Sequence, residues 1–133
     1  MATVELTYNN FKDTVETSPT VFVDFWAEWC GPCRMFGPVY EEVSGANPDI
    51  VFAKVDTEAQ QQLAAEFQIT SIPTLMAIRD GVVLYSQPGA LPKANLEQLV
   101  QAVRDVDMDA VRADIASQSG ATSEPAESES TQA

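Results

Sequence analysis

The sequence predicts an α/β fold in which a central mixed sheet of five strands is flanked by about four helices. In the N-terminal half, strand-like apolar runs alternate with segments of helical spacing, an order typical of a parallel sheet. Asp80-Gly81, between two further strand-like segments, predicts an antiparallel hairpin because this dipeptide readily adopts the positive φ angles of a tight turn. With 133 residues, 45% of them hydrophobic, the chain is long enough for one domain with a single core.

The first elements expected are a short strand at Thr3–Leu6 and a helix that Asn9 caps and Pro19 ends. The next segment, Val21–Trp26, is apolar at nearly every position. Such a run indicates a strand that is covered on both faces. We therefore expect it at the centre of the sheet.

A helix with a broad apolar face is expected after Cys33, because Met35, Val39 and Val43 recur at every fourth position. Pro38 lies inside this helix and should kink it, since proline lacks a backbone donor and crowds the preceding turn. A strand at Ile50–Val55 follows, and then a short helix that presents Leu63, Ala64 and Phe67 on one face.

The C-terminal half is expected to begin with the hairpin, whose strands are Thr74–Ile78 and Val82–Ser86. Pro92 suits the first turn of a last helix that covers one face of the sheet. The apolar side of that helix consists of Leu96, Leu99, Val100 and Val103, which have helical spacing.

The end of the chain differs in composition from the expected domain of residues 1–106. Residues 107–116 contain Met108, Val111 and Ile115 at sparse helical spacing, so the last helix continues or a short second helix forms there. Residues 117–133 hold no aromatic or large aliphatic side chain and are expected to be a disordered acidic tail, because they cannot bury enough apolar surface to order.

The charge of the chain excludes several classes of partner. Seven Lys and Arg residues against twenty Asp and Glu residues give a net charge of −13, which repels phosphate backbones and anionic membrane surfaces. We therefore expect no nucleic-acid or membrane partner, and treat the acidic surface as a device for the solubility of a monomer. The first residues show no basic leader followed by an apolar stretch, so a cytoplasmic location is expected.

The two cysteines carry the strongest functional signal. A chain with two Cys and no His cannot build a Cys₄ or Cys₂His₂ zinc site alone, and a disulfide across two residues closes too small a loop to stabilise the fold. Redox chemistry of a Cys30–Cys33 dithiol, with no bound cofactor, is the interpretation that remains. If a helix begins near Cys30, its unpaired N–H groups and dipole favour a thiolate there, which makes Cys30 the expected nucleophile. Cys33 lies one turn further in, behind Pro32, so we expect it to be the less exposed of the two and placed to resolve a mixed disulfide.

The segment Trp26–Cys33, which reads WAEWCGPC, resembles the active-site segment of thioredoxins of the reducing, WCGPC type position for position. The resemblance extends from about Val4 to Val106 and implies a thioredoxin fold. Further matches are Asp24, Lys54, Ile72, Pro73, Thr74, Gly89 and Ala90. The acidic residues 107–133 depart from the family pattern and have no assigned role.

The resemblance also implies roles for these residues. Asp24 matches a buried aspartate that accepts a proton from Cys33, and burial of a carboxyl should raise its pKa; the alternative is an Asp hydrogen-bonded at a strand end. Lys54 either tunes Asp24 or projects to solvent. A cis Ile72-Pro73 bond would bring its loop beside Cys30. The client-facing surface implied by the family is Trp29, Gly31, Pro32, Ile72, Pro73, Gly89 and Ala90, with core packing as the alternative for Trp29.

The resemblance implies that the protein is a protein-disulfide reductase that helps maintain cell redox homeostasis. The resemblance implies an NADPH-dependent flavoprotein thioredoxin reductase as its electron donor, and clients such as peroxiredoxins, methionine sulfoxide reductase and ribonucleotide reductase.

Three other interpretations stay open on the sequence: a disulfide-forming oxidant of an exported compartment, a binding module with idle thiols, and a metal-bridged dimer. Gly31-Pro32 counts against the oxidant, because reducing and oxidising family members differ at these two positions.

Overall fold

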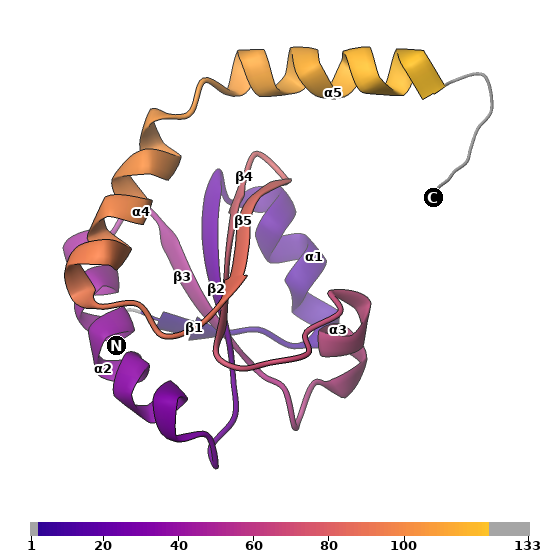
Figure 1. The fold of residues 1–133 in the computed structure, drawn as a ribbon. Helices are drawn as coiled ribbons and strands as arrows, with labels where there is room; N and C mark the ends of the chain where they lie inside the picture. The colour runs from indigo at the N-terminus through magenta and orange to yellow at the C-terminus, as the bar shows by residue number, and fades with distance from the viewer. Residues whose placement is uncertain (1–2, 123–133) are drawn as a thin grey trace.

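The five-stranded mixed sheet predicted from the sequence is confirmed by a computed structural model, which describes residues 3–122 and the side chains of residues 3–118. The strand order is β1-β3-β2-β4-β5; β3 is parallel to β1 and β2, whereas β4 is antiparallel to β2 and β5 (Figure 1). In chain order the elements are β1 (Thr3–Glu5), α1 (Tyr8–Thr17), β2 (Thr20–Trp26), α2 (Gly31–Ala46), β3 (Val51–Asp56), α3 (Gln61–Glu66), β4 (Thr74–Arg79), β5 (Val82–Pro88), α4 (Lys93–Asp105) and α5 (Met108–Thr122).

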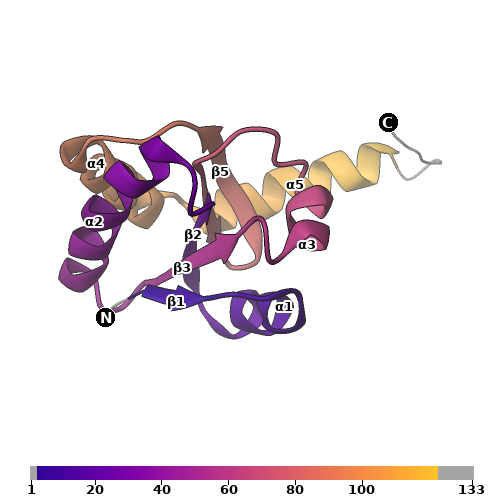
Figure 2. The ribbon, with the colours of Figure 1, turned by 90° about the horizontal axis from the view of Figure 1, so that it is seen from below.

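The central position of β2 follows from its apolar sequence. All five residues between Thr20 and Trp26 are buried, and the strand pairs with β3 on one side and β4 on the other. Helices α2 and α4 cover one face of the sheet, and α1 and α3 the other (Figure 2). Because β2 ends at Trp26 and α2 begins at Gly31, the Cys30 segment lies in the loop between a fully buried strand and the helix that packs on it.

Two details of the helices differ from the sequence-based expectation. The N-cap of α1 is Thr7 and not Asn9, because Thr7 is extended and its N–H donates to Asn10 Oδ1 at 2.7 Å. In α2, Met35 is exposed, and the buried row consists of Phe36, Tyr40 and Val43, spaced four and three apart. The helix passes through Pro38 without interruption.

The C-terminal region forms a separate helix, α5, because Val106 after α4 is extended and ends that helix. Residues 117–122 belong to α5, although their composition predicts disorder. Helical backbone hydrogen bonds are local, so a helix can extend past the residues that pack on the domain. Met108 is buried and Arg112 pairs with Asp80 in the β4–β5 turn, whereas residues 117 and 118 are exposed. The predicted tail beyond residue 122 lies outside the described residues.

Arg79 joins the end of β4 to the end of α4. Its Nη1 lies within hydrogen-bond distance of the carbonyl oxygens of Val103 (2.9 Å), Arg104 (3.1 Å) and Val106 (2.9 Å) at the end of α4. Carbonyl groups at a helix C-terminus lack the full set of intrahelical donors. Of these three, the Val103 carbonyl also accepts a backbone bond, from the Val106 N–H at 3.4 Å. Arg79→Met is expected to lower the free energy of unfolding in urea by about 2 kcal/mol, since hydrogen bonds from a charged donor are lost. Arg112→Met, which removes exposed ion pairs with Asp80 and Asp109, is the control and should cost less than about 1 kcal/mol. Equal losses in the two variants would contradict this role of Arg79.

Candidate active site

Cys30 and Cys33 form a disulfide at the start of α2. Cys30 is the N-cap of the helix, and the Cys33 N–H donates to Cys30 Sγ at 3.2 Å. The sulfur thus occupies the place at which a capping oxygen usually accepts from the first turn. In the reduced protein, the same donor and the positive end of the helix dipole favour a thiolate at Cys30 over one at Cys33.

Exposure does not distinguish the two cysteines. Each is 4% exposed, which corrects the expectation that Cys30 is the exposed member of the pair. Both sulfurs lie in a small apolar cluster with Ala27, and Trp26 and Ile72 pack against it. The asymmetry of the pair therefore comes from the position of each sulfur relative to the helix end.

The loop before β4 brings backbone close to Cys30. The Ile72-Pro73 bond is cis, as the resemblance implies, and the Ile72 carbonyl oxygen lies 3.7 Å from Cys30 Sγ. The Gly89 N–H donates to the Pro73 carbonyl oxygen at 2.8 Å, which ties the end of β5 to this loop. Gly89 has a φ of +114°, a backbone conformation that side chains disfavour.

An exposed rim surrounds the buried disulfide. Trp29 is 65% exposed, so the alternative that it packs in the core is wrong. Gly31 and Pro32 are exposed as well. Sequence reasoning missed Met35, which lies one turn into α2 and is 77% exposed. The available signal was its place on the helix, next to the buried row of Phe36, Tyr40 and Val43 but not part of it. Ala90 lines a shallow hollow on this side of α2, together with Met35, Phe36, Val39, Leu91 and Pro92.

Asp24 lies in the middle of β2, fully buried, and neither carboxylate oxygen has a hydrogen-bond partner. The alternative of an Asp hydrogen-bonded at a strand end is therefore wrong. Burial raises the pKa of Asp24 to about 7, although the positive charge of Lys54 opposes the increase. Lys54 is the partner of Asp24 in the β2–β3 register, and its Nζ lies 4.6 Å from the centre of the Trp26 ring.

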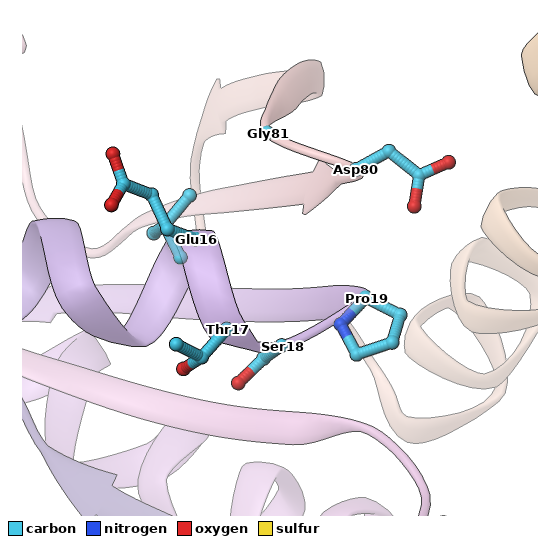
Figure 3. A pocket seen from close by; sticks show the side chains of 7 residues that line it. Glu16, Thr17, Ser18, Pro19, Asp80 and Gly81 are labelled. Atoms are coloured by element: carbon cyan, nitrogen blue, oxygen red, sulfur yellow. The ribbon is translucent and has the colours of Figure 1, made fainter.

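The remaining surface offers no comparable site within the described residues. No group of three or more Cys, His, Asp or Glu side chains among them could hold a metal ion, and none of their helices is long and apolar enough to cross a membrane. A hollow between the end of α1 and the β4–β5 turn lies at the other end of β2 from the cysteines (Figure 3). The carboxylates of Glu16 and Asp80 there point away from each other.

Comparison with known proteins agrees with this geometry. The Thioredoxin family model matches residues 2–102. "Putative thioredoxin 2" of Streptomyces coelicolor is 57% identical over 117 residues, which are 88% of this chain and 87% of that protein, so the similarity reaches past residue 106 into α5. Thioredoxin of Staphylococcus saprophyticus is 39% identical over 102 residues, which are 76% of this chain and 97% of its own.

Solved structures show the same fold. A Plasmodium falciparum thioredoxin has a TM-score of 0.70 and 33% identity, and the match covers 75% of this chain and 97% of that one. A mutant thioredoxin from Halobacterium salinarum has a TM-score of 0.72 and 27% identity, covering 80% of this chain and 95% of that one. With a cysteine pair at the helix N-terminus, a fold shared with these structures and a family match over most of its length, the chain belongs to the thioredoxin family of thiol-disulfide oxidoreductases.

Proposed function

We propose that this disulfide reductase uses Cys30 as the attacking thiolate and Cys33 as the resolving thiol. The observation that carries the assignment is the N-cap position of Cys30, whose sulfur accepts from the Cys33 N–H. A hydrogen bond to the thiolate stabilises it at one cysteine only. The nearness of Cys33 to Cys30 Sγ supports its proposed role in resolving the mixed disulfide.

The reaction proceeds in two exchanges. The Cys30 thiolate attacks one sulfur of a client disulfide, which forms a mixed disulfide and releases the other client sulfur as a thiolate. Cys33 loses its proton and attacks Cys30 Sγ, which releases the second client thiolate and forms the Cys30–Cys33 disulfide. Two electrons pass to the client in the complete cycle.

Asp24 is proposed as the acceptor of the Cys33 proton. Its pKa of about 7, set by burial against the charge of Lys54, supports this role because both protonation states are populated near neutral pH. Lys54 is proposed as the residue that tunes it: without the neighbouring positive charge, the carboxyl would hold its proton to higher pH.

The proposed client surface consists of Trp29, Gly31, Pro32, Ile72, Pro73, Gly89 and Ala90. The short distance from the Ile72 carbonyl to Cys30 Sγ supports a mode in which an extended client segment lies along the Ile72-Pro73 backbone. The exposed Trp29 ring supplies apolar contact area beside the reacting sulfur.

The proposed electron donor is an NADPH-dependent flavoprotein thioredoxin reductase, and the proposed setting is the cytoplasm, where the chain contributes to redox homeostasis. Clients such as peroxiredoxins, methionine sulfoxide reductase and ribonucleotide reductase are proposed by family membership. A reducing compartment suits a dithiol that must be regenerated after each cycle.

Reduction of insulin disulfides by the dithiol form tests the proposal. We expect rapid precipitation of the reduced insulin chains, whereas an idle-thiol binding module gives none. A strongly oxidising reduction potential of the Cys30–Cys33 pair would instead favour a disulfide-forming oxidant and contradict the proposed direction.

A further inference from the structure

A shallow hollow lies between α2 and the connection from β5 to α4, the helix beside α2 in Figure 2. Its lining consists of the apolar side chains of Met35, Phe36, Val39, Ala90, Leu91 and Pro92. Phe36 is buried and forms the base, because it belongs to the core cluster against which Val39 and Leu91 pack. We refer to this surface as the Met35 hollow, after the most exposed residue at its edge.

The two walls of the Met35 hollow run from the reactive cysteines to an ion pair. Near the cysteines, Ala90 follows Gly89, whose N–H donates to the carbonyl oxygen of Pro73 at 2.8 Å in the cis-proline loop. At the other end, Lys93 Nζ lies 2.7 Å from Glu42 Oε2 and joins the start of α4 to α2. The hollow therefore continues the client surface at Ala90, and its walls are joined again further along α2.

The size and chemistry of the Met35 hollow favour a side chain of another protein over a small molecule. Its volume is about 280 Å³. Small-molecule sites usually enclose about 300–1,000 Å³ and hold their ligand with a few well-placed polar groups. The side chains that line this hollow are all apolar. Met35 is 77% exposed, and a methionine side chain is flexible enough to adapt to apolar groups of different shapes.

The distance from Cys30 determines which client residue can reach the hollow. Met35 and Val39 follow Cys30, the N-cap of α2, so their Cα atoms lie about 8 and 14 Å further along the helix axis. An extended client segment advances about 3.3 Å per residue. If the segment continues from the reacting sulfur past Ala90, a side chain about three residues from the client cysteine falls between Met35 and Val39.

We propose that the Met35 hollow is a specificity site for client proteins, which binds a large apolar side chain about three residues from the reacting client cysteine. The inference deepens the proposed disulfide-reductase function and rests on it. Burial of the client side chain between Met35 and Val39 stabilises the encounter with clients that carry such a residue. Clients with a polar residue at that position lose this contribution and react more slowly.

Reaction of the reduced protein with a series of synthetic peptides tests the inference. Each peptide holds one cysteine as a disulfide with thionitrobenzoate, an aromatic thiolate that is a good leaving group, so Cys30 attacks the peptide sulfur and the coloured thiolate is released. Leucine or asparagine is placed in turn at each position near the cysteine, on both sides. We expect the ratio of the leucine to the asparagine rate constant to peak at about tenfold, about three residues away on one side, since apolar contacts discriminate by about tenfold or more.

Two variants assign that preference to the hollow. Met35→Gln keeps the length of the side chain and Val39→Thr keeps its shape, and each places a polar group in the lining. Each should lower the peak ratio about threefold, because a buried polar group without a partner opposes binding of the leucine. Ile115→Gln makes the same kind of change at an exposed apolar residue of α5 and should leave the ratio unchanged. Urea unfolding checks that all three variants are folded.

Several outcomes would overturn the inference. Equal rate constants for leucine and asparagine at every position would do so while leaving the disulfide-reductase function in place. A leucine preference that persists in both hollow variants would assign it to another surface, such as Trp29. If that preference persisted and the variants were instead reduced more slowly by thioredoxin reductase, the hollow would belong to the electron donor and not to clients. Failure to reduce both insulin and every peptide would defeat the proposed function and the inference with it.

Discussion

Asp24→Asn is expected to make the protein more stable than the wild type by about 4 kcal/mol above pH 7, while the two have similar stability near pH 4. Burial raises the pKa of Asp24 from 3.8 in the unfolded chain to about 7 in the folded protein. Between these values the folded state holds a proton that the unfolded state has released. Wild-type stability therefore falls as pH rises through this range and is constant above it.

Urea unfolding of the oxidised protein at intervals from pH 4 to pH 9 measures this difference, provided that the m value is the same for both proteins. Oxidation removes cysteine titration from the comparison. The control is Asp13→Asn, at an exposed position on α1, where stability should stay within about 0.5 kcal/mol of the wild type. A pH profile of Asp24→Asn that runs parallel to the wild-type profile would show that Asp24 is not the titrating group.

Cys33→Ser is expected to lower insulin turnover by at least about a hundredfold and to accumulate a disulfide between Cys30 and the client. The resolving thiol normally attacks from within the same molecule at a very high effective concentration, and the serine hydroxyl cannot replace it. Turbidity of reduced insulin gives the rate, and non-reducing electrophoresis with mass spectrometry identifies the trapped species.

Cys30→Ser is the matched variant for this experiment. It should also lose turnover, but without a trapped client, because the remaining Cys33 sulfur lies inside α2 and lacks the N-cap position. If the client were trapped by Cys30→Ser and not by Cys33→Ser, the roles of attacking and resolving cysteine would be exchanged.

Local sequence signals were sufficient for the sheet and the cysteine pair. From Val21 to Trp26 every residue of β2 except Asp24 is apolar, which indicates burial on both faces. The Asp80-Gly81 turn indicates the β4–β5 hairpin. The position of Cys30 at the start of a helix follows from its place between an apolar strand and Pro32.

Contacts that depend on strand register could not be derived from local sequence patterns. Nothing local to Lys54 indicates that it faces Asp24 across β2 and β3, or that its ammonium lies over Trp26. Only the resemblance to thioredoxins indicated that Lys54 could act on Asp24, and the register of β2 and β3 supplies the physical reason.

Helix α5 shows a limit of composition as a predictor. Low apolar content predicts that a segment cannot build a core, but a helix anchored at one end needs no core along its whole length. Met108 and Arg112 supply the anchor. The similarity to the Streptomyces protein, over 117 residues, extends into the sequence of this helix.

The β4–β5 hairpin joins the Ile72-Pro73 loop, which borders Cys30, to the loop that begins at Gly89. Thr74 pairs with Pro88 at its open end, and the bond from Gly89 to Pro73 closes the loops just beyond that pair. The Asp80-Gly81 turn lies at the opposite end. A length change within β5 would displace Gly89 from Pro73, whereas a peptide inserted at the turn leaves their spacing intact. For an engineer who wishes to display a peptide on this protein, the turn is the insertion point that preserves the reactive surface.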